Sequence, residues 1–176
     1  MDYFELYTLP VSFHVDEGQV KKKFYELSKK FHPDFYINES DEKQAEILEL
    51  STENNKAYQV LSNPLKRIEY VLQLNNLMVE GDKYQLPQDF LMEMMEVNET
   101  LMELEFDDDP LALEKIRNEI AAIEKGLFDE LYQYTNQFDA EANLENETIL
   151  LKIKDIWYRQ KYLLRIRESL NKFASR

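Results

Sequence analysis

The chain has 176 residues, with 35 Asp+Glu against 21 Lys+Arg and no Cys. Its net charge of −14 argues against non-specific nucleic-acid binding, which depends on neutralising phosphates, and the lack of Cys excludes disulfides, thiolate metal sites and Cys catalysis. Only 3 Gly and 5 Pro are present; folds with many tight turns need more of both, so the composition predicts an all-α protein.

The N-terminal part predicts a short helical turn over residues 3–6 and then one amphipathic helix. Asp16 is a predicted N-cap, because its side chain can accept from the unpaired backbone N–H groups of the first turn. Apolar side chains then recur at helical spacing until Pro33, which ends the helix since the residue before a proline avoids α geometry. These apolar residues are Val20, Phe24, Leu27 and Phe31.

Residues 32–40 predict a loop, and two further helices follow it. The first is capped at Ser40 or Asp41, and the second opens with Asn63 followed by Pro64, a cap and a proline at the first helical position. We therefore expect two helices joined by the loop as an antiparallel hairpin, with a third helix after it.

Three long helices are predicted beyond a boundary that holds a Gly, a Pro and several turn-forming residues. Each begins at a cap or proline signal, at Pro87, at Asp109–Pro110 and at Asn143. Because their connections are short, we expect them to form an antiparallel three-helix bundle, over about 87–105, 110–137 and 144–174. The predicted organisation is a domain at 1–75, a linker at 76–86 and a domain at 87–176.

Charge is distributed unevenly along the chain. Residues 1–75 have a net charge of −4, residues 80–147 a net charge of −16, and residues 148–176 a net charge of +6. An acidic middle and a basic end attract each other. This pattern fits either complementary helices packed within the molecule or charged faces that remain for a partner.

Several classes of function are not expected. No run of 18 apolar residues is present, and the N-terminus is too acidic for a signal peptide, so we expect no membrane association. The lack of Cys suits a reducing compartment, and we expect the cytoplasm. No Cys is present and His32 lies in a predicted loop, so we expect no catalytic residue, and we expect no metal site and no cofactor. Asp107–Asp109 precede Pro110 and predict a solvated helix start rather than a hydrolase site.

His32, Pro33 and Asp34 follow directly after a helix whose outer face is basic. Alone, the three residues could be a turn in which Asp34 bonds its own loop. Their position adds weight, because a basic helix precedes them and an antiparallel helix ending in NKAYQVLSNP follows. Physically, Pro33 fixes the loop, Asp34 offers a charged acceptor to an Arg, and lysines steer an acidic surface.

This arrangement resembles the J-domain of DnaJ-type co-chaperones. The resemblance implies docking on a DnaK-type chaperone and stimulation of its ATPase. Asn55, Ala57, Tyr58 and Leu61 match the third-helix pattern, whereas Phe35 stands where many J-domains carry Lys. The chaperone-binding residues implied are His32, Pro33, Asp34, Lys22, Lys23, Tyr25, Lys29 and Lys30.

The first helix of the predicted bundle has two apolar stripes. One, which contains Phe90, Met94, Val97, Leu101 and Leu104, is sufficient for packing in a bundle. The other contains Leu91, Met92, Met95 and Met102 and is bordered by Glu96, Glu99 and Glu103. Since Met repacks easily, the second stripe suits a binding surface, but it could equally be core. In the last helix, Ile149, Ile153, Ile156, Leu163 and Leu170 form a predicted core seam.

Together with DYFELYTLP, PLKRIEYVLQL and FLMEMME, these features resemble the HscB type of J-protein, which serves iron–sulfur cluster biogenesis. The resemblance implies an L-shaped molecule whose acidic C-terminal bundle binds the cluster scaffold IscU and delivers it to HscA, a DnaK-type chaperone. Eukaryotic relatives carry a four-Cys zinc module, so the lack of Cys favours a bacterial-type protein. The scaffold-binding residues implied are Leu91, Met92, Met95, Glu96, Glu99, Glu103 and Tyr162.

We therefore predict a monomeric co-chaperone rather than an enzyme. Two alternatives stay open on the sequence. A general J-protein would use the second stripe for a different client, and a structural helical protein would dimerise through that stripe and keep a vestigial J-like loop.

Overall fold

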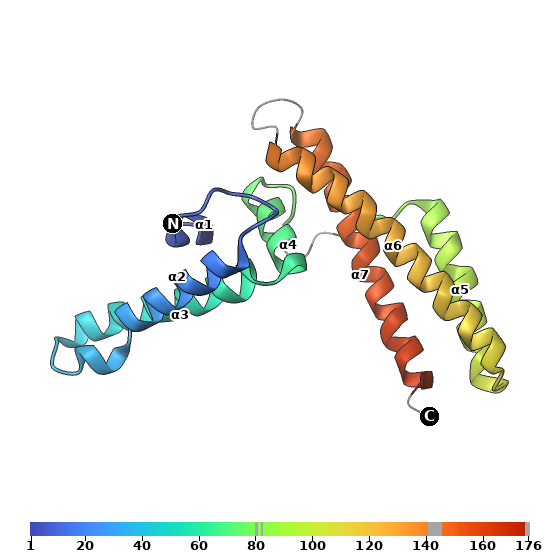
Figure 1. Cartoon of the computed structure of the whole chain (residues 1–176), viewed down its shortest axis with the longest axis horizontal. Coiled ribbons are helices and arrows are strands. Elements are labelled where there is room, and N and C mark those ends of the chain that lie inside the picture. Colours follow the sequence, from blue (N-terminus) through green and yellow to red (C-terminus); the bar gives the residue numbers. More distant parts are fainter. Residues whose placement is uncertain (80, 82, 141–145, 175–176) are drawn as a thin grey trace. The chain divides into compact units, whose positions relative to one another are not determined.

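The computed structural model describes residues 1–79, 81, 83–140 and 146–174, and within these ranges the regular secondary structure is helical throughout. The chain divides into two compact units, Met1–Asn76 and Leu77–Arg176 (Figure 1). The first unit contains α1 (Tyr3–Tyr7), α2 (Glu17–Lys30), the 3₁₀ helix η1 (Pro33–Tyr36), α3 (Asp41–Leu61) and α4 (Pro64–Leu74). The second contains α5 (Gln88–Phe106), α6 (Pro110–Ala140) and α7 (Asn146–Ala174).

The predicted N-caps of the first unit are confirmed. The side chain of Asp16 accepts a hydrogen bond from the Gln19 N–H, and Ser40 caps α3 by accepting from the Lys43 N–H. Asn63 caps α4, and Pro64 occupies its first turn. Each cap satisfies an N–H group that the helix itself leaves unpaired.

The prediction of a plain loop over 32–40 was wrong in one respect, because Pro33–Tyr36 form a 3₁₀ helix. His32 has the extended geometry expected before a proline, with φ −72° and ψ 121°. The Phe35 N–H then bonds to the His32 carbonyl at 3.1 Å, which closes the turn. The residues after the proline therefore form an ordered turn.

The core of the first unit lies where α1, α2 and α4 each pack against α3. The antiparallel pair α2 and α3 forms the hairpin expected from the sequence (Figure 1). Arg67 is buried and ties α4 to the preceding chain, since its guanidinium donates to the carbonyls of Phe13 and Leu61. The buried apolar side chains include Phe4, Tyr7, Phe13, Val20, Leu27, Ile47, Leu61, Val71 and Leu72.

The second unit is a three-helix bundle. The helices α6 and α7 pack against each other and run antiparallel (Figure 1). Lys152 near the start of α7 lies over the Tyr134 ring near the end of α6, whereas Arg167 near the end of α7 pairs with Glu124 in the middle of α6. The helix α5 packs on both. All five residues of the predicted α7 seam are buried, which confirms that prediction.

The predicted cap Asn143 lies outside the described residues. Among those that are described, no helix is long and apolar enough to cross a membrane.

Candidate functional site

His32, Pro33 and Asp34 lie at the tip of the α2–α3 hairpin, where the turn fixes their backbone. The Asp34 N–H donates to His32 Nδ1 at 3.3 Å, and an Asp34 carboxylate oxygen lies 3.7 Å from the same nitrogen. The Asp34 side chain is nevertheless 77% exposed. The turn therefore fixes the backbone of Asp34 and leaves its carboxylate accessible to a cationic partner group.

Two side chains anchor this tip to the helices on either side. The Tyr36 hydroxyl donates to the Lys30 carbonyl at 2.8 Å, at the end of α2. The Gln44 amide, in the first turn of α3, donates to the carbonyls of Ile37 at 3.1 Å and Glu39 at 2.9 Å. Neither anchor was predicted from the sequence. They hold the signature residues in place while Phe35 and Ile37 stay exposed.

Lys22 and Lys29 lie on the outer side of α2, away from the buried residues Val20 and Leu27, whereas Lys23 is three and four residues from these two and borders the inner side. Lys22, Lys29 and Lys30 are exposed, and Lys23 is half-buried 3.5 Å from Glu26. The exposed ring of Tyr25 lies on the same outer side. The exposed residues among these, together with His32, Pro33 and Asp34, are named here the J face.

The buried Asn54 fixes α2 against α3, a role that the sequence analysis did not identify. Its amide nitrogen donates to the Phe24 carbonyl at 3.2 Å and to the Ser28 hydroxyl at 3.0 Å. Its side-chain oxygen accepts from the Tyr7 hydroxyl at 2.9 Å. The Phe24 ring stacks on Tyr58 at 4.2 Å between centroids. This network sets the register that places the J face on the outside.

The two stripes of α5 have different environments, which answers the question left open by its sequence. Phe90, Met94, Val97 and Leu101 are buried, and Leu104 is half-buried. The second stripe faces solvent. The structure therefore brings six predicted residues together on one exposed surface, named here the α5 face: Leu91, Met92, Met95, Glu96, Glu99 and Glu103.

Tyr162 is the one predicted residue of the bundle that does not lie on α5. It is half-buried on α7, and its ring meets Phe90 edge-on at 6.0 Å. Phe90 belongs to the buried stripe, and the Arg159 guanidinium lies 5.5 Å from the same ring. Tyr162 therefore supports the packing of α5 on α7 from the buried side.

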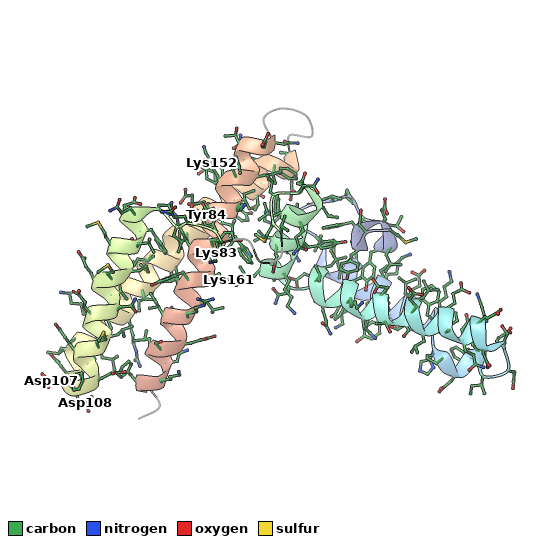
Figure 2. All side chains as sticks on the ribbon, turned by 180° about the vertical axis from the view of Figure 1, so that it is seen from behind. Lys83, Tyr84, Asp107, Asp108, Lys152 and Lys161 are labelled. Carbon is green, nitrogen blue, oxygen red and sulfur yellow. The ribbon has the colours of Figure 1, made fainter. Side chains whose placement is uncertain are left out.

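Tyr84 attaches the segment before α5 to α7, a contact that the sequence analysis did not find (Figure 2). Its hydroxyl donates to Asp155 at 2.6 Å, and its ring stacks on Tyr158 at 4.3 Å between centroids. Burial raises the pKa of Tyr84 above its usual value, and the hydrogen bond to the Asp155 carboxylate adds to this. Among the described residues, no cluster of three or more His, Asp or Glu side chains could hold a metal ion.

Two family models match the chain, one in each unit. Residues 2–70 match the family model of the DnaJ domain, and residues 86–171 match that of the HSCB C-terminal oligomerisation domain. The chain is 34% identical over 143 residues to the co-chaperone protein HscB homolog of Photobacterium profundum, a match that covers 80% of this chain and 84% of that protein. The chain belongs to the HscB family of co-chaperones.

Other relatives agree with this assignment. The co-chaperone protein HscB homolog of Pseudoalteromonas atlantica is 34% identical over 88% of this chain and 89% of its own. The crystal structure of human co-chaperone protein HscB matches with a TM-score of 0.75 and 28% identity, over 97% of this chain and 81% of that one. Chaperone HscB from Vibrio cholerae matches with a TM-score of 0.64 and 29% identity, over 97% of this chain and 99% of that one.

The predicted HscB-type resemblance is thus confirmed, and so is the all-α fold with a J-domain and a C-terminal helical domain. The roles assigned to individual residues of the J face and the α5 face stay predictions.

Proposed function

We propose that this chain couples an iron–sulfur scaffold protein of the IscU type to a DnaK- or HscA-type chaperone. The J face binds the chaperone and stimulates its ATPase, and the α5 face binds the scaffold. The observation that carries the proposal is that α5 buries one apolar stripe in the bundle and exposes a second, Met-rich stripe.

The chaperone half of the proposal is supported by the chemistry of the J face. Asp34 is exposed, and its backbone is fixed by Pro33 and by the hydrogen bond to His32. A charged acceptor held in this way favours a bidentate contact with an Arg of the partner. The exposed lysines of α2 attract an acidic chaperone surface and speed its encounter with the J face.

The scaffold half is supported by the composition of the α5 face. Large exposed apolar side chains bordered by carboxylates mark a protein-binding surface more than a solvated helix. Met side chains are unbranched and polarizable, so they adapt to an apolar partner surface. The carboxylates of Glu96, Glu99 and Glu103 suit a partner whose apolar contact is bordered by Lys or Arg.

Coupling follows when both faces are occupied together. Binding of the scaffold by the bundle then brings it close to the chaperone held by the J-domain, at an effective concentration of roughly millimolar for a short connection. ATP hydrolysis takes place in the chaperone, so this chain acts as a non-enzymatic regulator. We place it in the bacterial cytoplasm as a monomer. The HscB homologs named above are bacterial, and the lack of Cys suits a reducing compartment.

A three-component pull-down tests this division of labour. The chaperone is immobilised, and capture of the scaffold is measured with the wild-type protein, with Asp34→Asn and with Leu91→Ala/Met92→Ala/Met95→Ala. Wild type bridges the two proteins. The Asp34 variant still binds free scaffold but not the chaperone, and the triple variant binds the chaperone but not the scaffold.

Three results would contradict the proposal. Wild type that binds the chaperone but no scaffold would favour a general J-protein with another client. Wild type that binds neither, but forms a dimer abolished by the triple substitution, would favour a structural role. Loss of both interactions in either variant would mean that the two faces do not act separately.

A further inference from the structure

The exposed apolar stripe of α5 continues beyond the α5 face to the end of the helix. Met102 and Phe106 follow Met95 at spacings of seven and four residues, which are near neighbours on one side of a helix. Met102 is exposed, and Phe106 is 89% exposed. From Leu91 to Phe106 the stripe spans fifteen residues, a rise of about 22 Å along the helix axis.

The backbone around Phe106 is fixed although the residue lies at the end of α5. The Asp107 N–H bonds to the Glu103 carbonyl at 3.0 Å, and the Asp109 N–H bonds to the Asp107 carbonyl at 2.9 Å. Asp109 in turn accepts hydrogen bonds from the first N–H groups of α6. The turn between α5 and α6 is therefore ordered, so Phe106 extends outward from a fixed helix end.

Every charged residue close to Met102 and Phe106 in the sequence is acidic. Residues 88–114 contain ten Asp+Glu and no Lys, Arg or His. Asp107 and Asp108 lie at the tip of the hairpin that joins α5 to α6 (Figure 2). Carboxylates around an exposed aromatic ring oppose contact with another acidic surface and favour one with Lys or Arg at its border.

We infer that the surface which binds the scaffold extends through Met102 to Phe106, so that Phe106 fills an apolar pocket of the scaffold with Lys or Arg at its edge. This inference rests on the proposed function, because the same partner covers the α5 face and its continuation. Large aromatic side chains that become buried dominate many protein interfaces. Phe106 accordingly determines both affinity and the position of the scaffold along α5.

Calorimetric titration of the full-length protein with an IscU-type scaffold tests the inference. Met102→Ala/Phe106→Ala is compared with wild type, and Phe106→Leu serves as the conservative variant. Leu111→Ala is the matched control, because Leu111 is also exposed beside the same turn but belongs to α6. We expect the double variant to bind about tenfold more weakly or worse, Phe106→Leu to keep most of the affinity, and Leu111→Ala to bind within about twofold of wild type.

The outcomes separate this inference from the proposed function. Wild-type affinity in the double variant, together with loss of binding in Leu91→Ala/Met92→Ala/Met95→Ala, would overturn the extension and leave the proposed function standing. No binding by wild type would overturn both. An equal loss in Leu111→Ala would place the contact on the turn and overturn the assignment to the stripe. A wild-type dimer that Phe106→Ala converts to a monomer would show that a second copy is the occupant, which also overturns it.

Discussion

Replacing Leu91, Met92 and Met95 by Ala should weaken scaffold binding while leaving the free energy of unfolding almost unchanged. The three side chains are 36%, 59% and 60% exposed. Full burial of such a side chain contributes about 1.5–3 kcal/mol, and scaling this by the exposed fractions gives about 2–5 kcal/mol for the three together. The Kd for the scaffold should therefore rise by about 30-fold to 4,000-fold.

The free energy of unfolding should change little, because exposed side chains contribute at most about 0.5 kcal/mol each to stability. Met94 provides the matched control, since it lies between these residues in sequence but is 0% exposed. Met94→Ala opens a cavity and should cost about 2–5 kcal/mol of stability. At a temperature where this variant is folded, it should bind the scaffold within about threefold of wild type.

Titration calorimetry gives both affinities, and urea denaturation followed by circular dichroism gives both stabilities. Wild-type affinity in the triple variant would refute the assignment of the α5 face. A stability loss in the triple variant as large as that of Met94→Ala would refute the division of α5 into a buried and an exposed stripe.

Three further predictions concern the packing and the tip of the first unit and the attachment of Tyr84. Asn54→Ala removes three side-chain hydrogen bonds, including the one from Tyr7, and should cost about 2–4 kcal/mol in urea denaturation; a loss below about 1 kcal/mol would contradict the network. Because burial and Asp155 raise the pKa of Tyr84 in the folded state, only the unfolded chain ionises this group readily, so its contribution to stability is present below about pH 10 and is lost above it. Tyr84→Phe should therefore lose less stability than wild type between about pH 9 and 11. An equal fall in the free energy of unfolding of the two proteins over this range would count against this. Phe35→Lys adds a cation beside the docking loop and should make chaperone affinity fall more steeply with salt, measured at two ionic strengths; an unchanged slope would exclude a contact there.

Local signals in the sequence were enough to predict most helices. Asp16, Ser40 and Asn63 each mark a helix start by a side chain that caps the N–H groups next to it, so the information lies within three residues. The α7 seam was equally readable from its spacing, because a core-facing stripe repeats with the helical period.

Contacts between distant parts of the chain were not predictable in this way. Tyr84 and Asp155 are 71 positions apart, and Asn54 joins three helices, so neither pattern is visible in any short window. The turn at Pro33–Tyr36 was missed because a 3₁₀ helix of four residues has no periodicity to detect.

The J face could be predicted from the sequence more completely than the α5 face. His32, Pro33 and Asp34 are contiguous, so this motif, together with its position between a basic helix and an antiparallel helix, pointed to the J-domain. On α5, periodicity showed two apolar stripes but could not say whether the bundle covers both or leaves the second exposed, since both have the helical period. Only the packing of α5 on α6 and α7 identifies the exposed stripe, and with it the continuation through Met102 and Phe106.

The central claim, that this protein drives a chaperone through its J face while presenting a scaffold, is tested most directly by steady-state ATPase measurements. A DnaK- or HscA-type chaperone is assayed alone, with this protein, and with this protein and an IscU-type scaffold. We predict stimulation by the wild-type protein, a further increase when the scaffold is added, and loss of both effects in His32→Gln and Asp34→Asn. An ATPase rate that the wild-type protein leaves unchanged with every such chaperone, with and without scaffold, would contradict the account.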